Sequence, residues 1–112
     1  MRLAIQTQEF IDFYESVSGR VQEKIDYIVH MMQELPTVHS KFIKKLQNTD
    51  YYEMRISVDN EYRVILFAVD NNDFRQTSQI LLLNGFVKKS TKDYKAQLAI
   101  ADRIIAEYYE KD

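Results

Sequence analysis

The sequence contains no cysteine, one proline and two glycines in 112 residues. Without cysteine the chain has neither disulfides nor a thiol nucleophile, and any zinc site would depend on histidine and carboxylates. Because glycine and proline, which interrupt helices and strands, are so rare, most of the chain is expected to form regular secondary structure. No apolar run approaches the roughly 20 residues that span a bilayer, and the N-terminus lacks the pattern of a secretion signal. We therefore expect a cytoplasmic protein without a membrane segment.

The composition that is present is typical of a globular protein. Apolar residues make up 46% of the chain and charged residues 29%. A chain of this length fits one domain over residues 1–112 and can bury one modest core without a metal or a disulfide. The two histidines, His30 and His39, are interpreted as a structural helix residue and an exposed residue. We expect no metal and no cofactor.

The net charge of −2 is unevenly distributed. Residues 1–40 carry 3 basic and 6 acidic side chains, residues 41–95 carry 10 and 7, and residues 96–112 carry 2 and 4. A weakly basic middle therefore lies between two acidic ends. Any surface for RNA would be local, and the acidic ends would suit a basic partner or simply solubility.

The first and last parts of the chain show helical spacing of apolar residues. One helix is expected from Thr7 or Gln8 to Ser18-Gly19, and a second from there to Pro36, so the two form a hairpin. A short edge strand could precede them over residues 2–7. After residue 89, Ser90 or Thr91 could cap a last helix.

The middle of the chain alternates with a period of two, which is typical of strands. Asp59-Asn60 marks a turn between two such strands, and residues 70–78 are expected to form a polar loop. Residues 80–87 are almost continuously apolar and indicate a central strand buried on both faces. The predicted class is α+β: a helical hairpin, a mainly antiparallel sheet of three to four strands and a C-terminal helix.

The alternation also predicts which side chains share a face of the sheet. A two-residue loop at the turn would split the apolar residues between both faces. A three-residue loop over residues 59–61 pairs Val58 with Tyr62 and keeps the apolar residues together. Arg55, Ser57 and Arg63 then lie on the opposite face. We therefore predict that both arginines occupy one surface.

Four short motifs follow one another between residues 41 and 94. They are Phe42-Ile43-Lys44-Lys45-Leu46, Tyr52-Glu53-Met54-Arg55-Ile56, Glu61-Tyr62-Arg63-Val64 and Leu82-Leu83-Asn84-Gly85-Phe86-Val87-Lys88-Lys89. In this order and spacing the chain resembles the HigB-like, phage-derived group of the RelE/ParE toxins. Each motif alone is weak, and the close match covers about half of the chain.

The resemblance implies the toxin of a type II toxin–antitoxin system. Such a toxin is a metal-independent endoribonuclease that cuts mRNA, often on the ribosome, and is held inactive by a helix-turn-helix, HigA-like antitoxin. By position, Arg55 and Arg63 match the family's sheet arginines, and Lys88 and Lys89 match its basic pair after the last strand. Tyr94 lies near the place of a functional aromatic residue in some relatives.

These residue types suit RNA cleavage by the substrate's own 2′-hydroxyl. The reaction needs charge neutralisation at the phosphate and two proton transfers. Arg55 and Arg63 could stabilise the phosphorane, because guanidinium contacts phosphate in a bidentate manner. Lys88 or Lys89 could move a proton if neighbouring cations lower the lysine pKa. Tyr94 could stack a base or donate a proton, and Lys44 and Lys45 could contact RNA phosphates.

The same residues also have simpler interpretations. The arginines could be solvated strand positions paired with Glu53 or Glu61, and the lysines could form a solvated surface. The alternative function is a non-catalytic binding module of the same fold. It would be a ParE-like gyrase inhibitor or an inactive toxin kept for antitoxin binding.

Overall fold

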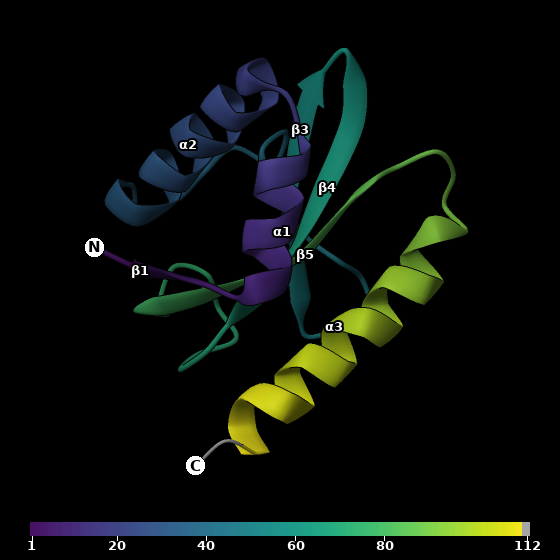
Figure 1. Ribbon diagram of the computed structural model, residues 1–112. Helices are drawn as coiled ribbons and strands as arrows, with labels where there is room; N and C mark the ends of the chain where they lie inside the picture. The colour runs from purple at the N-terminus through teal and green to yellow at the C-terminus, as the bar shows by residue number, and fades with distance from the viewer. Residues whose placement is uncertain (111–112) are drawn as a thin grey trace.

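The computed structural model describes residues 1–110, and within them the chain forms one sheet flanked by helices. Figure 1 shows the arrangement, with α1 and α2 on one side of the sheet and α3 on the other. The elements are β1 (Leu3–Gln6), α1 (Gln8–Ser16), α2 (Gly19–Glu34), β2 (Ile43–Lys45), β3 (Tyr51–Val58), β4 (Asn60–Ala68), β5 (Gln79–Val87) and α3 (Asp93–Glu110). None of these helices is long and apolar enough to cross a membrane.

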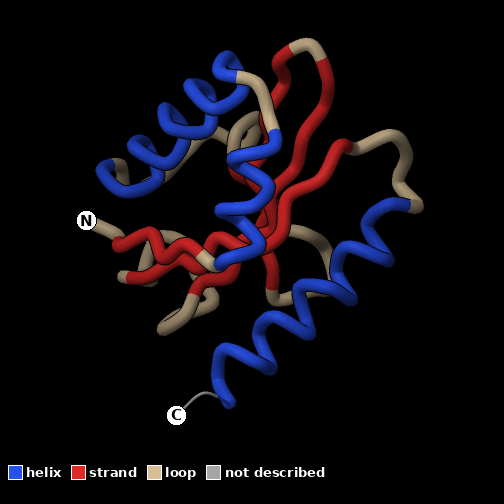
Figure 2. The backbone as a smooth tube through the Cα atoms, viewed as in Figure 1, coloured by secondary structure: helices blue, strands red, loops and turns tan. Residues whose placement is uncertain are grey.

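The sheet has the strand order β1-β5-β4-β3-β2. The edge strand β1 runs parallel to β5, and the other neighbours are antiparallel. The α+β class and the N-terminal edge strand are confirmed. The predicted number of three to four strands is too low, because the sheet has five. The missed strand, β2, is only three residues long, and a run that short cannot show a two-residue period. Figure 2 shows the strands together at the centre of the molecule.

The helical hairpin is confirmed, and capping side chains define where its helices begin. The hydroxyl of Thr7 accepts a hydrogen bond from Phe10 N at 3.2 Å and starts α1. Ser18 accepts one from Val21 N at 3.4 Å and starts α2. Such caps satisfy amide groups that lack a partner inside the helix. The second helix ends before Leu35-Pro36, as the proline predicts.

The two faces of the sheet bury separate apolar clusters. The α1/α2 face has the larger one, and the predicted apolar positions of β3 and β4 all belong to it or pack against it. The α3 face has a smaller cluster, built around Ile65, Leu83 and Ala101. The strand β5 contributes to both clusters, so the prediction that it is buried on both faces is confirmed.

The register of the β3–β4 hairpin differs from the prediction. Val58 pairs with Asn60, not with Tyr62, so the expected three-residue loop is wrong. Asp59 adopts a left-handed conformation with φ of 64°, which Asp tolerates, and this tightens the turn. The shift equals two residues and therefore leaves every side chain on its predicted face. Arg55 and Arg63 become direct cross-strand partners.

Candidate active site

The two sheet arginines lie under the start of α3, within a group of charged and phenolic side chains. We call this group the arginine cluster. Its members are Arg55, Arg63, Glu53, Glu61 and Tyr94. Four of them come from the paired strands β3 and β4, and Tyr94 comes from the first turn of α3.

Arg63 is the centre of the cluster and is almost completely buried, with 2% of its surface exposed. Its Nε lies 3.3 Å from Glu53 Oε1 and donates to the Tyr94 hydroxyl at 3.2 Å. Its Nη1 donates to Glu61 Oε1 at 3.1 Å and to the Tyr62 carbonyl at 2.9 Å. A buried guanidinium requires such partners, because desolvating an unpaired charge costs several kcal/mol.

Arg55 lies beside Arg63 but is held much more loosely. Its Nε is 3.9 Å from Glu53 Oε2, and about a third of its side chain, 32%, is exposed. Adjacent like charges repel, and Glu53 between them offsets that repulsion. Arg55 is therefore the sheet arginine that can accept an anionic ligand without giving up a short ion pair.

Tyr94 closes the cluster from above. Its hydroxyl donates a hydrogen bond to Glu53 Oε1 and accepts one from Arg63. Burial, together with the hydrogen bond to the Glu53 carboxylate and its charge, raises the pKa of Tyr94 to about 12. The phenol consequently stays protonated at neutral pH. In the structure it therefore acts as a hydrogen-bond donor and not as a base.

The two lysines after β5 are placed differently. The ammonium of Lys88 lies 5.6 Å from the centre of the Tyr94 ring, and its amide donates to the Glu61 carbonyl at 2.7 Å. Lys89 is exposed, and its amide donates to the Asp93 carboxylate at 2.7 Å. Lys88 thus stands at the rim of the arginine cluster, whereas the backbone of Lys89 belongs to the turn that leads into α3.

Lys44 and Lys45 point to opposite faces of the sheet. Lys44 pairs with Glu53 across β2 and β3, which places it on the face of the arginine cluster. Lys45 pairs with Tyr52 on the other face, donates to the Thr49 carbonyl and lies 5.8 Å from the Tyr52 ring centre. The structure therefore joins Lys44, and not Lys45, to the surface around the cluster.

Comparison with known proteins identifies the family. The sequence profile of the family described as "Phage derived protein Gp49-like" matches residues 12–106, from α1 into α3. The chain belongs to this Gp49-like family. The match extends well beyond residues 41–94, which carry the motifs.

Solved structures with the fold of this Gp49-like protein include two RelE proteins. An arginine-to-alanine double mutant of the E. coli toxin RelE in the free state is 13% identical, with a TM-score of 0.63 over 92% of this chain and 97% of that chain. The RelB-RelE antitoxin-toxin complex from Methanococcus jannaschii is 25% identical, with a TM-score of 0.56 over 80% and 96%. No curated protein matches the chain. The expected resemblance to a phage-derived toxin family and the expected RelE-like fold are confirmed.

Two carboxylates of the cluster were not among the predicted site residues of the Gp49-like chain. Glu53 is only 5% exposed and contacts both arginines. A hydrogen bond from Ser57, at 2.6 Å, and one from Arg63 lower the pKa of Glu61, so Glu61 is ionised at neutral pH. The alternation that put Arg55 and Arg63 on one face also put Glu53 and Glu61 there. Their position on the same face as the two arginines was the signal that could have identified them.

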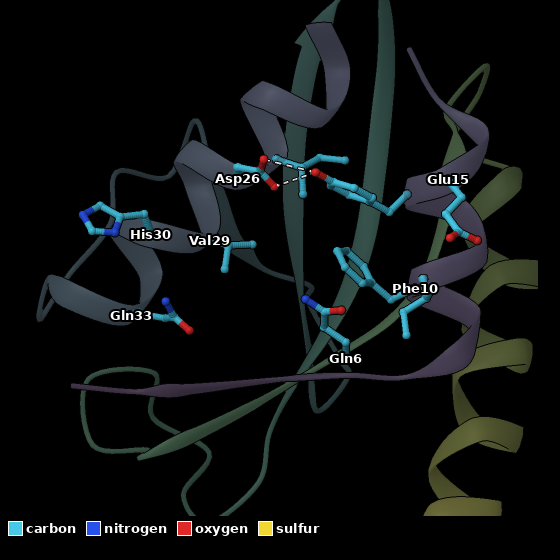
Figure 3. A pocket seen from close by; sticks show the side chains of 10 residues that line it. Gln6, Phe10, Glu15, Asp26, Val29, His30 and Gln33 are labelled. Carbon is cyan, nitrogen blue, oxygen red and sulfur yellow. Dashed lines mark hydrogen bonds between the residues drawn. The ribbon is translucent and has the colours of Figure 1, made fainter. Parts of the chain in front are cut away.

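A separate hollow of about 380 Å³ lies on the opposite face, between α1, α2 and β1. Figure 3 shows its lining, with Phe10 from α1, Val29 from α2, and Glu15, Asp26 and His30 around the rim. The Tyr14 hydroxyl donates to Asp26 across it, at 2.9 Å. The hollow has acidic and apolar side chains but no lysine or arginine, so it does not suit a phosphate. Within residues 1–110 no three His, Asp or Glu side chains gather in a way that could hold a metal.

Proposed function

We propose that this Gp49-like protein is the toxin of a type II toxin–antitoxin pair and a metal-independent endoribonuclease that cleaves mRNA. The observation that carries the proposal is the pairing of Arg55 and Arg63 on one sheet face, with Lys88 at the rim. Three cations (Arg55, Arg63, Lys88) face two carboxylates (Glu53, Glu61), so the formal charge is 3 − 2 = +1. Such a site favours a phosphate whose charge increases in the transition state.

The geometry suggests a different role for each arginine. Arg55 binds the scissile phosphate, since its guanidinium is partly exposed and only loosely paired. Arg63 is a positioning residue, because its Nε and Nη1 are already engaged by Glu53, Glu61 and Tyr94. It fixes the carboxylate and the phenol relative to Arg55 and adds positive potential in a poorly solvated place.

Two groups suit the proton transfers. Glu53 Oε1 is engaged by Arg63 and Tyr94, whereas Oε2 faces Arg55 at 3.9 Å and can accept the proton of the 2′-hydroxyl. The 2′-oxygen then attacks phosphorus, the bond to the 5′-oxygen breaks, and Lys88 donates a proton to that leaving oxygen. The products are a 2′,3′-cyclic phosphate and a 5′-hydroxyl. Lys44 and the exposed Lys89 would contact neighbouring phosphates.

The proposed partners follow from the family and the fold. The Methanococcus jannaschii neighbour was solved as an antitoxin–toxin complex, which supports an antitoxin partner for this chain as well. That this antitoxin is a helix-turn-helix, HigA-like protein, and that cleavage takes place on the ribosome, are further parts of the proposal. So is a cytoplasmic location, where mRNA and ribosomes occur.

The first test compares the wild type with Arg55→Gln on a defined mRNA, with and without translating ribosomes. Removing one transition-state donor typically lowers the rate by about 10²- to 10³-fold, and Arg55→Gln should show a loss of that size. Arg103→Gln on α3 is the matched control, because within residues 1–110 its only ion pair is the exposed one with Glu107 at 3.7 Å. Cleavage is measured by mapping new 5′ ends and by testing the 3′ ends for a cyclic phosphate.

A second candidate function is a binding module without catalysis. The contacts of Arg63 favour it, since a buried arginine whose Nε and Nη1 are paired with Glu53 and Glu61 can serve the fold alone. Intact RNA under both conditions, with a stable wild-type protein that captures gyrase or its antitoxin, would support this module and contradict the endoribonuclease.

A further inference from the structure

A second group of cations and aromatic rings lies outside the arginine cluster, at the β2 end of the sheet. We call it the aromatic patch. It comprises Tyr27 and Lys24 from α2, and Lys41 and Phe42 from the segment before β2. The lysines of residues 41–45 come without any acidic residue among them.

The aromatic patch is built from specific contacts. The rings of Tyr27 and Phe42 meet edge to face with centres 6.2 Å apart. The ammonium of Lys24 lies 5.3 Å from the Tyr27 ring centre and 5.0 Å from that of Phe42. Lys41 lies 5.0 Å from the Phe42 ring. Neither lysine forms an ion pair within residues 1–110, so their charges are not neutralised by a nearby carboxylate.

Tyr27 is unusually accessible for a large ring on a packed helix, with 53% of its surface exposed. A shallow hollow of about 300 Å³ adjoins it, lined by Arg20, Glu23, Lys24, Tyr27 and Val58. Arg20 reaches Asp59 at 3.1 Å, but both side chains are largely exposed, and such pairs hold weakly. An exposed ring beside a hollow that two cations, Arg20 and Lys24, help to line can bind a nucleobase and its phosphates.

The aromatic patch is also connected to the arginine cluster through the backbone. The amide of Arg55 donates to the carbonyl of Phe42 at 2.7 Å, so the two residues are neighbours across the β2–β3 edge. Lys44, two residues along, lies on the cluster's face opposite Glu53. A single strand that passes over this edge would therefore meet cations on both sides of the sheet.

We propose that the aromatic patch binds single-stranded RNA next to the cleaved phosphate, with a base stacked on Tyr27 and phosphates on Lys24 and Lys41. This inference rests on the proposed endoribonuclease function and names a binding site away from its reacting atoms. Base stacking on an aromatic side chain tolerates any sequence. The patch therefore contributes affinity and a path for the strand, and it does not select a base.

The test measures binding apart from cleavage. A fluorescein-labelled RNA of about 12 nucleotides, with every 2′-hydroxyl methylated, cannot be cut by 2′-oxygen attack. Titration followed by anisotropy should show about 5- to 100-fold weaker binding for Tyr27→Ala and near wild-type binding for Tyr27→Phe. Tyr109→Ala on α3 is the matched control, since Tyr109 is similarly exposed, at 47%. Lys24→Gln should reduce the slope of log K against log salt by about 0.7.

Different outcomes separate this inference from the proposed function. Unchanged binding by both Tyr27→Ala and Lys24→Gln overturns the aromatic patch, even if Arg55→Gln still slows cleavage as proposed. Weaker binding by Tyr27→Ala with a wild type that cuts no RNA supports the patch and contradicts the endoribonuclease. Weaker binding by Tyr109→Ala to the same degree also overturns the patch, because the effect would then be general to exposed tyrosines.

Discussion

The two faces of the sheet are both covered by helices, but they bury different kinds of side chain. Under α1 and α2 the strands contribute Met54, Ile56, Val64 and Leu66, all fully buried and apolar. Under α3 the same strands contribute a smaller apolar cluster together with the ionised groups around Arg63. One face therefore has the packing of an ordinary core, and the other has charges enclosed beside a core.

This difference indicates how the chain separates stability from chemistry. Apolar burial stabilises by roughly 25 cal/mol per Å² and needs no particular geometry of charge. A buried ion network adds little stability over apolar residues of the same shape, but breaking it is costly. The α1/α2 face can therefore account for the fold. The α3 face keeps charged groups that add little stability, which suits a role in acting on a ligand.

The largest expected effect comes from breaking the network on the α3 face. Arg63→Met keeps the apolar volume but removes the shorter ion pair of the buried Glu53 and leaves it only the 3.9 Å contact with Arg55. The free energy of unfolding should fall by about 3–5 kcal/mol, measured by urea denaturation at pH 7. The double variant Glu53→Gln/Arg63→Met also removes the charge of the buried Glu53 carboxylate. It should therefore recover part of the lost unfolding free energy. A single variant as stable as the wild type would mean that the two faces do not differ in this way.

A smaller effect is expected from crowding the α1/α2 face. A Cβ added to Gly85 in β5 would lie 2.4 Å from Cγ and Cδ2 of Phe13, so the ring would have to move. Gly85→Ala should cost about 1–3 kcal/mol, by the same denaturation measurement. Gly19→Ala is the control, because a Cβ there meets nothing within 4 Å. If both alanines had the same effect, tight packing of Phe13 on β5 would be ruled out.

The same contrast explains what could be predicted from the sequence. The faces of Arg55 and Arg63 follow from alternation, because every second side chain of a strand lies on the same face of the sheet. The pairing of Val58 does not, because it depends on the left-handed Asp59, and alternation carries no information about turn geometry. The bounds of the first two helices followed from helical spacing, Ser18-Gly19 and Pro36, and the structure adds the caps at Thr7 and Ser18.

The composition of the arginine cluster could be predicted only in part. Arg63 and Tyr94 are 31 residues apart and meet because α3 packs back over the sheet. No local pattern specifies that angle. The buried Arg2 was missed for a similar reason, since its guanidinium is satisfied by the carbonyls of Phe74 and Met32, at 2.8 Å each. Main-chain carbonyls of distant segments cannot be inferred from the residues next to the arginine in the sequence.

The smallest expected effect is the dependence on pH that Tyr94 gives to the α3 face. The pKa of Tyr94 is about 12 in the folded protein and about 10 when unfolded, so folding favours the protonated phenol. Its stabilising contribution is complete below pH 10 and is lost as the pH rises from 10 toward 12. The difference in unfolding free energy between the wild type and Tyr94→Phe should be constant from pH 7 to 9.5 and shrink above pH 10. Tyr51, whose pKa is also raised, is present in both proteins and cancels in that difference. A difference that stayed constant to pH 11.5 would show that Tyr94 is not held against Glu53 in solution.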